Sequence, residues 1–135
     1  MWIGIDVMTE DELGDLLGRP WFRRYVYDAD ELALADSFGA ERAREFLTGR
    51  FAGKEAALKV IGTGVGAGVT PRQVAILRAD DGAPVVRLSG TAAQRARERG
   101  IGALNLSITH KKGFVVAAAI GVPARCGHHR DRPDD

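Results

Sequence analysis

The stretch "GRFAGKEAALKVIG", residues 49–62, decides the fold, because it forms the second half of a long helical pattern. The pattern starts near Gly39 and ends at Gly62, since glycine is favoured just past the end of a helix. Positions four apart lie on one face of a helix. On the apolar face this row reads Ala43, Leu47, Phe51, Glu55 and Lys59. The helix is therefore expected to turn a carboxylate toward the surface on which it packs.

Glu55 has two interpretations. A buried ionised carboxylate is costly unless it is paired with a cation or bound to a metal. Lys59 follows one turn later, in the order that favours an ion pair, and such a pair is typical of the half-solvated edge of an apolar stripe. The alternative is a metal ion held by Glu55 and another oxygen ligand. This segment alone leaves both interpretations open.

Composition excludes several classes of protein. The chain has 135 residues, which suits one domain with one core. Its 19 Lys and Arg against 18 Asp and Glu give a net charge of +1, so nothing indicates a nucleic-acid partner. The single cysteine, Cys126, cannot form an internal disulfide, and the sequence has neither a signal-peptide pattern nor a membrane-spanning apolar run. A cytoplasmic protein without a membrane partner is expected.

The rest of the chain is expected to form short helices and pairs of strands. Further helices are expected over residues 10–17, 31–37 and 91–100. Strands are expected over residues 2–7, 73–79, 84–89, 103–109 and 114–122. The first strand delivers Asp6 at its end, and the last four form hairpins closed by "DDGA" and "HKKG". This order predicts an α+β fold with a largely antiparallel sheet.

Local signals also predict where elements begin and end. Gly18 and Pro20 stop the first short helix, and either Asp28 or Asp30 caps the second. No repeat or linker divides the chain. A single domain over residues 1–122 is expected, followed by a disordered tail over residues 123–135.

Four glycines in seven residues, from Gly62 to Gly68, form a loop directly after the long helix. Phosphate-binding loops of the Walker and Rossmann types come before their helix, so neither is present. The loop can still cradle a phosphate with its own amides, or it can be a flexible connector.

Asp6 and Glu55 are the two carboxylates best placed to converge, one on a strand and one on the helical row that faces it. Two carboxylates completed by phosphate and water oxygens describe a Mg²⁺ site. Positive charge for a polyphosphate is expected from Arg42, Arg50, Lys54 and Lys59. The alternative is a solvated basic face, which the spacing favours for Arg42.

His110 ends a strand close to Ser107 and Thr109. These side chains can bind a phosphate or orient a base, although a histidine in a turn is often merely exposed. In the tail, Cys126 and two histidines, His128 and His129, lack a second cluster at a usual spacing, so a zinc site is not expected.

Three of these segments together resemble the holo-acyl-carrier-protein synthase family of 4′-phosphopantetheinyl transferases. "GIDV" (residues 4–7) resembles the first motif, and "GRFAGKEAALKVIGTGVG" (residues 49–66) resembles the central and most diagnostic one. "LSITH" (residues 106–110), followed by "VVAAAI", resembles the last. The similarity covers residues 3–121 in the same order and at the same separations.

The resemblance implies a fold with long helices on a small sheet, and a homotrimer with active sites at subunit boundaries. It also implies a reaction in which the phosphopantetheine arm of coenzyme A moves to a serine of an apo acyl carrier protein, releasing 3′,5′-ADP. The carrier belongs to fatty-acid, polyketide or peptide synthesis. Glu55 then removes the serine proton, either directly or through a water molecule.

Matched position by position, the family's motifs imply roles for individual residues. Asp6 and Glu55 match the Mg²⁺ ligands, and Lys59 matches the lysine at the leaving phosphate. The matched coenzyme A contacts are Arg50, Gly62, Gly64 and His110, with Arg42 offered from a neighbouring subunit. Lys54, Ser107 and Thr109 are expected at the same substrate.

One segment departs from the family. The helix after the first motif is commonly basic there and docks on an acidic carrier, but here it reads Glu10, Asp11, Glu12 and Asp15. We therefore expect either a carrier other than the usual acidic one, or a carrier held mostly by "WFRRY", residues 21–25. Two other functions remain open: a non-catalytic coenzyme A or carrier-binding domain, and a nucleotide-binding regulatory domain suggested by the glycine loop.

Overall fold

The computed structural model describes residues 1–62 and 68–125. In chain order its elements are β1 (Trp2–Thr9), the 3-10 helix η1 (Gly14–Gly18), α1 (Pro20–Val26), α2 (Ala29–Asp36), α3 (Ala40–Ile61), the 3-10 helix η2 (Pro71–Gln73), β2 (Val74–Arg78), β3 (Pro84–Leu88), α4 (Gly90–Glu98), β4 (Ile101–Lys111) and β5 (Phe114–Pro123). This confirms the α+β class. In the described part of the chain, no helix is both long enough and apolar enough to cross a membrane.

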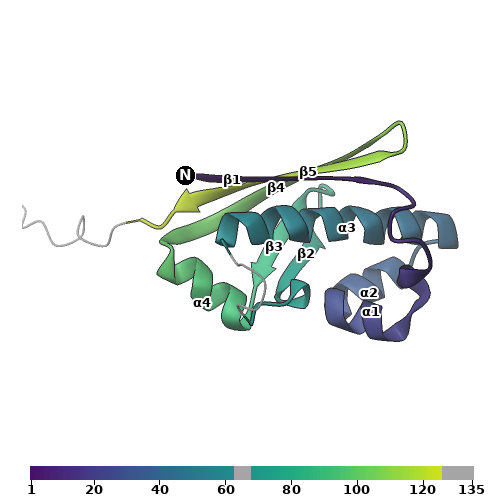
Figure 1. Cartoon of the computed structure of the whole chain (residues 1–135), viewed down its shortest axis with the longest axis horizontal. Helices are drawn as coiled ribbons and strands as arrows, with labels where there is room; N and C mark the ends of the chain where they lie inside the picture. Colours follow the sequence, from purple (N-terminus) through teal and green to yellow (C-terminus); the bar gives the residue numbers. More distant parts are fainter. Residues whose placement is uncertain (63–67, 126–135) are drawn as a thin grey trace, which may run out of the picture.

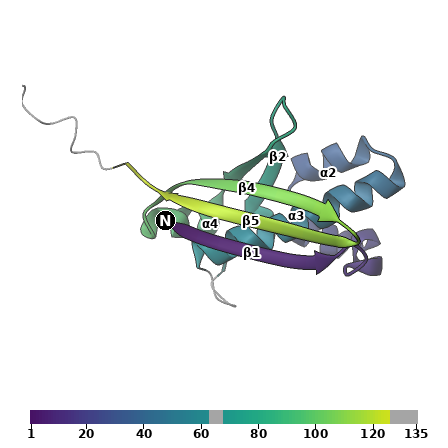
Figure 2. The ribbon, with the colours of Figure 1, turned by 90° about the horizontal axis from the view of Figure 1, so that it is seen from above.

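The strands form two antiparallel sheets where the sequence predicted one. The larger sheet has the order β1-β5-β4, and β2 pairs with β3 in the other. Helix α3 lies along one face of the larger sheet, and the remaining helices and the β2-β3 hairpin lie on the other side of α3 (Figure 1). Seen from above, β1 and β4 form the two edges of this sheet (Figure 2). Helix α3 is therefore the centre of the molecule.

Small residues on α3 allow this central packing. A Cβ on Gly53 would lie 2.7 Å from a methyl carbon of Ile76, and one on Gly4 would overlap the backbone oxygen of Ala56. Strand β1 and α3 therefore touch backbone to backbone at this crossing. The helix begins after Gly39 and ends at Gly62, whose φ of +77° is the left-handed conformation that favours glycine. Both predicted ends are confirmed.

The region between β1 and α3 differs most from the prediction. Residues 10–17 form turns and the short helix η1 instead of one acidic helix. Pro20 does not end a helix but begins α1, a position that suits its fixed φ and missing N–H. Asp28 is the cap of α2, in a capping box with Glu31.

Two further predictions are corrected or untested at strand ends. Strand β1 continues past Asp6 to Thr9, so Asp6 lies within the strand and not at its end. At the other terminus β5 continues to Pro123, the first residue of the predicted tail. Ala124 and Arg125 of this tail are also described, and Ala124 N–H donates to the backbone oxygen of Gly100 at 2.8 Å. The rest of the predicted tail, residues 126–135, lies outside the described residues, as does Gly64.

Candidate active site

Asp6 and Glu55 come together where β1 crosses α3. The close approach at Gly4 brings the Asp6 side chain to the helix surface that carries Glu55. Burial raises the pKa of the Glu55 carboxyl, and the charge of Asp6 raises it further, while Lys59 lowers it. Burial also raises the pKa of Asp6, and Lys59 opposes this. The predicted convergence of the two carboxylates is thus present in the structure.

Lys59 pairs with Asp6 and the β1 backbone. Its Nζ donates to the backbone oxygen of Ile5 at 2.7 Å and lies 3.5 Å from Asp6 Oδ1. Within residues 1–62 and 68–125, Glu55 forms no side-chain hydrogen bond or salt bridge. Lys59 is therefore paired with Asp6 and not with Glu55, although its charge still acts on the Glu55 carboxyl.

This carboxylate pair fits a divalent cation. Two neighbouring carboxylates with raised pKa values repel each other when ionised, and a cation between them relieves that repulsion. No group of three or more His, Cys, Asp or Glu side chains among the described residues could hold a metal ion. A cation here would therefore take its other ligands from phosphate and water, as Mg²⁺ commonly does.

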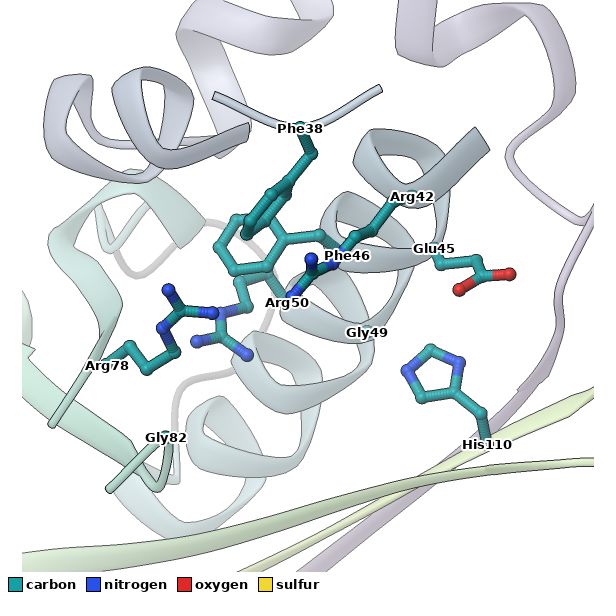
Figure 3. Close-up of a pocket in the computed structure, with 9 residues that line it drawn as sticks. All are labelled: Phe38, Arg42, Glu45, Phe46, Gly49, Arg50, Arg78, Gly82 and His110. Carbon is teal, nitrogen blue, oxygen red and sulfur yellow. The ribbon is translucent and has the colours of Figure 1, made fainter. Parts of the chain in front are cut away.

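A separate pocket, which we call the arginine pocket, lies between the N-terminal half of α3, the β2-β3 hairpin and the end of β4 (Figure 3). Its lining residues are Phe38, Arg42, Glu45, Phe46, Gly49, Arg50, Arg78, Gly82 and His110. Three arginines and one histidine around a single hollow suit an anion such as a phosphate. The sequence indicated Arg42, Arg50 and His110 but not Arg78, because that arginine reaches the pocket only through the folding of a distant hairpin.

Two arginines of this pocket are held by aromatic rings and backbone oxygens. The Arg42 guanidinium lies 4.3 Å from the centre of the Phe38 ring, and Arg50 lies at the same distance from Phe46. Arg50 also donates to the backbone oxygens of Ile76 and Leu77, at 3.1 and 3.2 Å. Burial lowers the pKa of Arg50 to about 10, so it remains charged at neutral pH. Arg50 is the rigid cation of the pocket.

His110 approaches α3 closely because Gly49 has no side chain. A Cβ on Gly49 would lie 2.9 Å from His110 Nε2. Leu106 and Ile108 pack against α3 on the same face of β4. Ser107 and Thr109 alternate with them and so point to the opposite face of the sheet. The predicted grouping of Ser107 and Thr109 with His110 is wrong.

Lys54 is not at the surface, contrary to its expected contact with a polyphosphate. Its side chain is fully buried, and its Nζ donates to Glu31 Oε1 and the Val74 backbone oxygen, both at 2.7 Å. Glu31 in turn accepts from the Ile76 backbone N–H at 2.9 Å. Burial lowers the pKa of Lys54, and the Glu31 charge opposes this. The pair joins α2, α3 and β2. No sequence pattern predicted Glu31 as its partner, because the two residues lie 23 positions apart.

The carboxylate pair and the arginine pocket lie on opposite sides of α3. Asp6 is on β1 and His110 on β4, the two edge strands of the larger sheet. Gly4 of β1 lies against Ala56 of α3, and His110 of β4 lies against Gly49, about 10 Å away along the helix axis. One small group therefore cannot touch both regions of a single chain.

Comparisons with known proteins agree over most of the chain. The family model of the 4′-phosphopantetheinyl transferase superfamily matches residues 3–119. A holo-[acyl-carrier-protein] synthase of Exiguobacterium sp. is 32% identical over 127 residues, 94% of each chain. The structure of a Plasmodium yoelii acyl carrier protein synthase with ADP bound has a TM-score of 0.80 at 28% identity, covering 92% of this chain and 96% of that one. A Bacillus anthracis holo-(acyl-carrier-protein) synthase in complex with CoA (3′,5′-ADP) has a TM-score of 0.74 at 29% identity, with the same coverage.

Proposed function

Because the chain belongs to the 4′-phosphopantetheinyl transferase superfamily, we propose that it transfers the 4′-phosphopantetheine group of coenzyme A to a serine of an apo acyl carrier protein. The serine oxygen forms the new bond to phosphorus, the bond within the pyrophosphate breaks, and 3′,5′-ADP leaves. The observation that carries the proposal is that the side chains of Asp6, Glu55 and Lys59 lie close together where β1 crosses α3. Phosphoryl transfer asks mainly for positioning and for stabilisation of charge on oxygen, and this group supplies both.

Each of the three side chains has a distinct role. Asp6 and Glu55 would hold a Mg²⁺ ion, which would supply positive charge for the pyrophosphate oxygens. Lys59, fixed by the Ile5 backbone oxygen, places its positive charge at the leaving phosphate. Glu55 accepts the serine proton, directly or through a water molecule.

We further propose that the arginine pocket binds a phosphate-bearing part of coenzyme A, supplied by another copy of the chain. The pocket is lined by the N-terminal half of α3, whereas Glu55 and Lys59 lie in its C-terminal half, and this separation supports a site shared between copies. The sheet face away from α3 exposes an apolar row, Ile3, Ile5, Val7 and Ile120, with exposed fractions of 39% to 65%. Such a face suits association with other copies, and the family resemblance favours a cytoplasmic homotrimer.

The direct test is the intact mass of apo carrier proteins after incubation with the protein, coenzyme A and Mg²⁺. Carriers of fatty-acid, polyketide and peptide synthesis form the panel, and a chelator is the control. We expect one carrier to gain the mass of one phosphopantetheine arm, and the chelator to abolish the gain. Tight binding of coenzyme A with no gain on any carrier would overturn the proposal in favour of a non-catalytic binding domain.

A further inference from the structure

A second cleft lies next to the arginine pocket, between the segment after β1 and the N-terminal half of α3. Four carboxylates line it: Glu10, Asp11, Glu41 and Glu45. Its basic lining residues are Arg44 and His110. We call it the acidic cleft. It shares Glu45 and His110 with the arginine pocket, so the two hollows are neighbours.

Thr48 gives the acidic cleft a feature beyond its charge. This residue lines the cleft, is only 1% exposed, and its hydroxyl has no hydrogen-bond partner among the described residues. A buried hydroxyl without a partner is costly, and most such groups in proteins are satisfied. A bound group that donates a hydrogen bond would satisfy Thr48.

The lining favours an extended cationic side chain over a metal ion. In the described ranges, no set of three or more His, Cys, Asp or Glu side chains is grouped to hold a metal. The four carboxylates are spread along the cleft, and none of them forms a salt bridge within the described part of the chain. Neither Lys111, the last residue of β4, nor Lys112 in the following turn lines the cleft. A lysine or arginine side chain is long and carries several N–H donors at its end. It can therefore donate hydrogen bonds to separated carboxylates and to the buried Thr48 hydroxyl.

We propose that the acidic cleft binds a lysine or arginine side chain of the carrier protein, close to the serine that is modified. The inference rests on the proposed function, because it requires a carrier. The cleft adjoins the arginine pocket, where coenzyme A is proposed to bind, so a carrier that receives the arm of this coenzyme A would lie close to the cleft. Charge complementarity of this kind sets partner choice and orientation more than overall affinity.

Charge reversal on the full chain tests the inference. Asp11→Lys and Glu41→Lys each reverse a carboxylate of the cleft, and Asp15→Lys makes the same change on the same exposed segment outside it. At saturating coenzyme A, we expect the first two to raise the KM for the apo carrier about tenfold or more. Their kcat and their KM for coenzyme A should stay close to those of the parent, as should all constants of the control.

Two complementary variants separate recognition from folding. The basic residues of the carrier can also be changed to acidic ones, one at a time. One of these carrier variants should be modified faster by Asp11→Lys and Glu41→Lys than by the parent protein. Thr48→Val removes the hydroxyl while keeping the shape, so it should raise the KM for the carrier without lowering the melting temperature.

Equal KM values for the two cleft variants and Asp15→Lys would overturn the inference while leaving the transferase activity intact. A parent protein that modifies no carrier would instead overturn the proposed function. In that case, calorimetric titration of apo carrier into the parent and into Asp11→Lys still decides, because equal affinities would show that the cleft binds no cation of the carrier.

Discussion

Glu55 is a carboxylate whose folded environment penalises its ionised form. Burial and the Asp6 charge raise its pKa, and Lys59 only partly opposes them. At pH values above the raised pKa, the ionised group therefore lowers the stability of the unliganded protein. This penalty is lost as the pH falls through the raised pKa toward the ordinary value of 4.5, where the group becomes neutral in both states.

Glu55→Gln should therefore have opposite effects on stability and activity. Without metal, it should raise the melting temperature at neutral pH, and the gain over the parent should vanish in acid. It should also lower the transfer rate about a hundredfold or more, as expected for loss of a general base. Thermal unfolding across pH and intact-mass rates measure the two effects, with exposed Glu98→Gln as the matched control. A lower melting temperature at neutral pH would mean that Glu55 has stabilising partners in the folded protein.

Lys54→Met should act on stability, not on the substrate. Removal of the lysine leaves Glu31 buried without its partner, which costs about 3–5 kcal/mol in comparable buried pairs. Lys54→Met combined with Glu31→Gln should recover much of that loss, measured by denaturant unfolding. For contrast, Lys59→Met should remove activity with little loss of stability, because Lys59 is largely exposed. A Lys54→Met protein that unfolds like the parent but has a raised KM for coenzyme A would restore the polyphosphate role predicted from the sequence.

The sequence predicted which way the Glu55 side chain points but not that Lys54 is buried, and both results have the same physical reason. A row of positions four apart shows which side chains share a face of a helix, but not what covers the other faces. Helix α3 is packed on two sides, by the larger sheet and by the layer that contains α1, α2 and the β2-β3 hairpin (Figure 1). A lysine that would be solvated on a surface helix therefore lies in the core.

At the scale of elements, the crossing of β1 and α3 positions the carboxylate pair. Gly4→Ala would place a methyl group against the Ala56 backbone oxygen, which cannot move without displacing the helix. We expect a loss of about 1–3 kcal/mol in stability and weaker Mg²⁺ binding, because β1 and Asp6 move away from Glu55. Unfolding and metal titration measure these effects. Gly18→Ala is the control, because its added methyl group meets no atom within 4 Å. If Gly4→Ala has the same stability and the same Mg²⁺ affinity as Gly18→Ala, the crossing does not position the carboxylate pair.

Elements defined by local signals were predicted well, and those that depend on distant contacts were not. The ends of α3 and both hairpin turns follow from glycines and turn residues, and all were confirmed. Pro20 alone did not predict a helix start, since proline is common both after the end of a helix and at its first position. The signal that was missed is the four-residue spacing of Phe22 and Val26, which are both buried in α1. The division into two sheets depends on strand pairing between hairpins, which no local pattern records.

At the scale of the whole molecule, the alternation in β1 predicted two faces but not which one is covered. Helix α3 covers the side of Gly4 and Met8, because only glycine allows the close approach at the crossing. The apolar row with Ile3 and Ile5 consequently remains exposed on the single chain. The proposed assembly of several copies would cover this surface and would bring together the two candidate substrate regions, which lie on opposite sides of α3 in one chain.

The measurement that tests this account most directly is transfer by a mixed assembly of two impaired chains. Glu55→Gln lacks the carboxylate, and His110→Ala lacks part of the arginine pocket. Coexpressed in equal amounts, they should regain about a quarter of the parental activity, since half of the chains supply each intact region and the pairing is random. Coexpressed His110→Ala and Arg42→Ala, both in the pocket, should regain none. If the first mixture is no more active than its separate components, the active site does not combine the carboxylates of one chain with the arginine pocket of another.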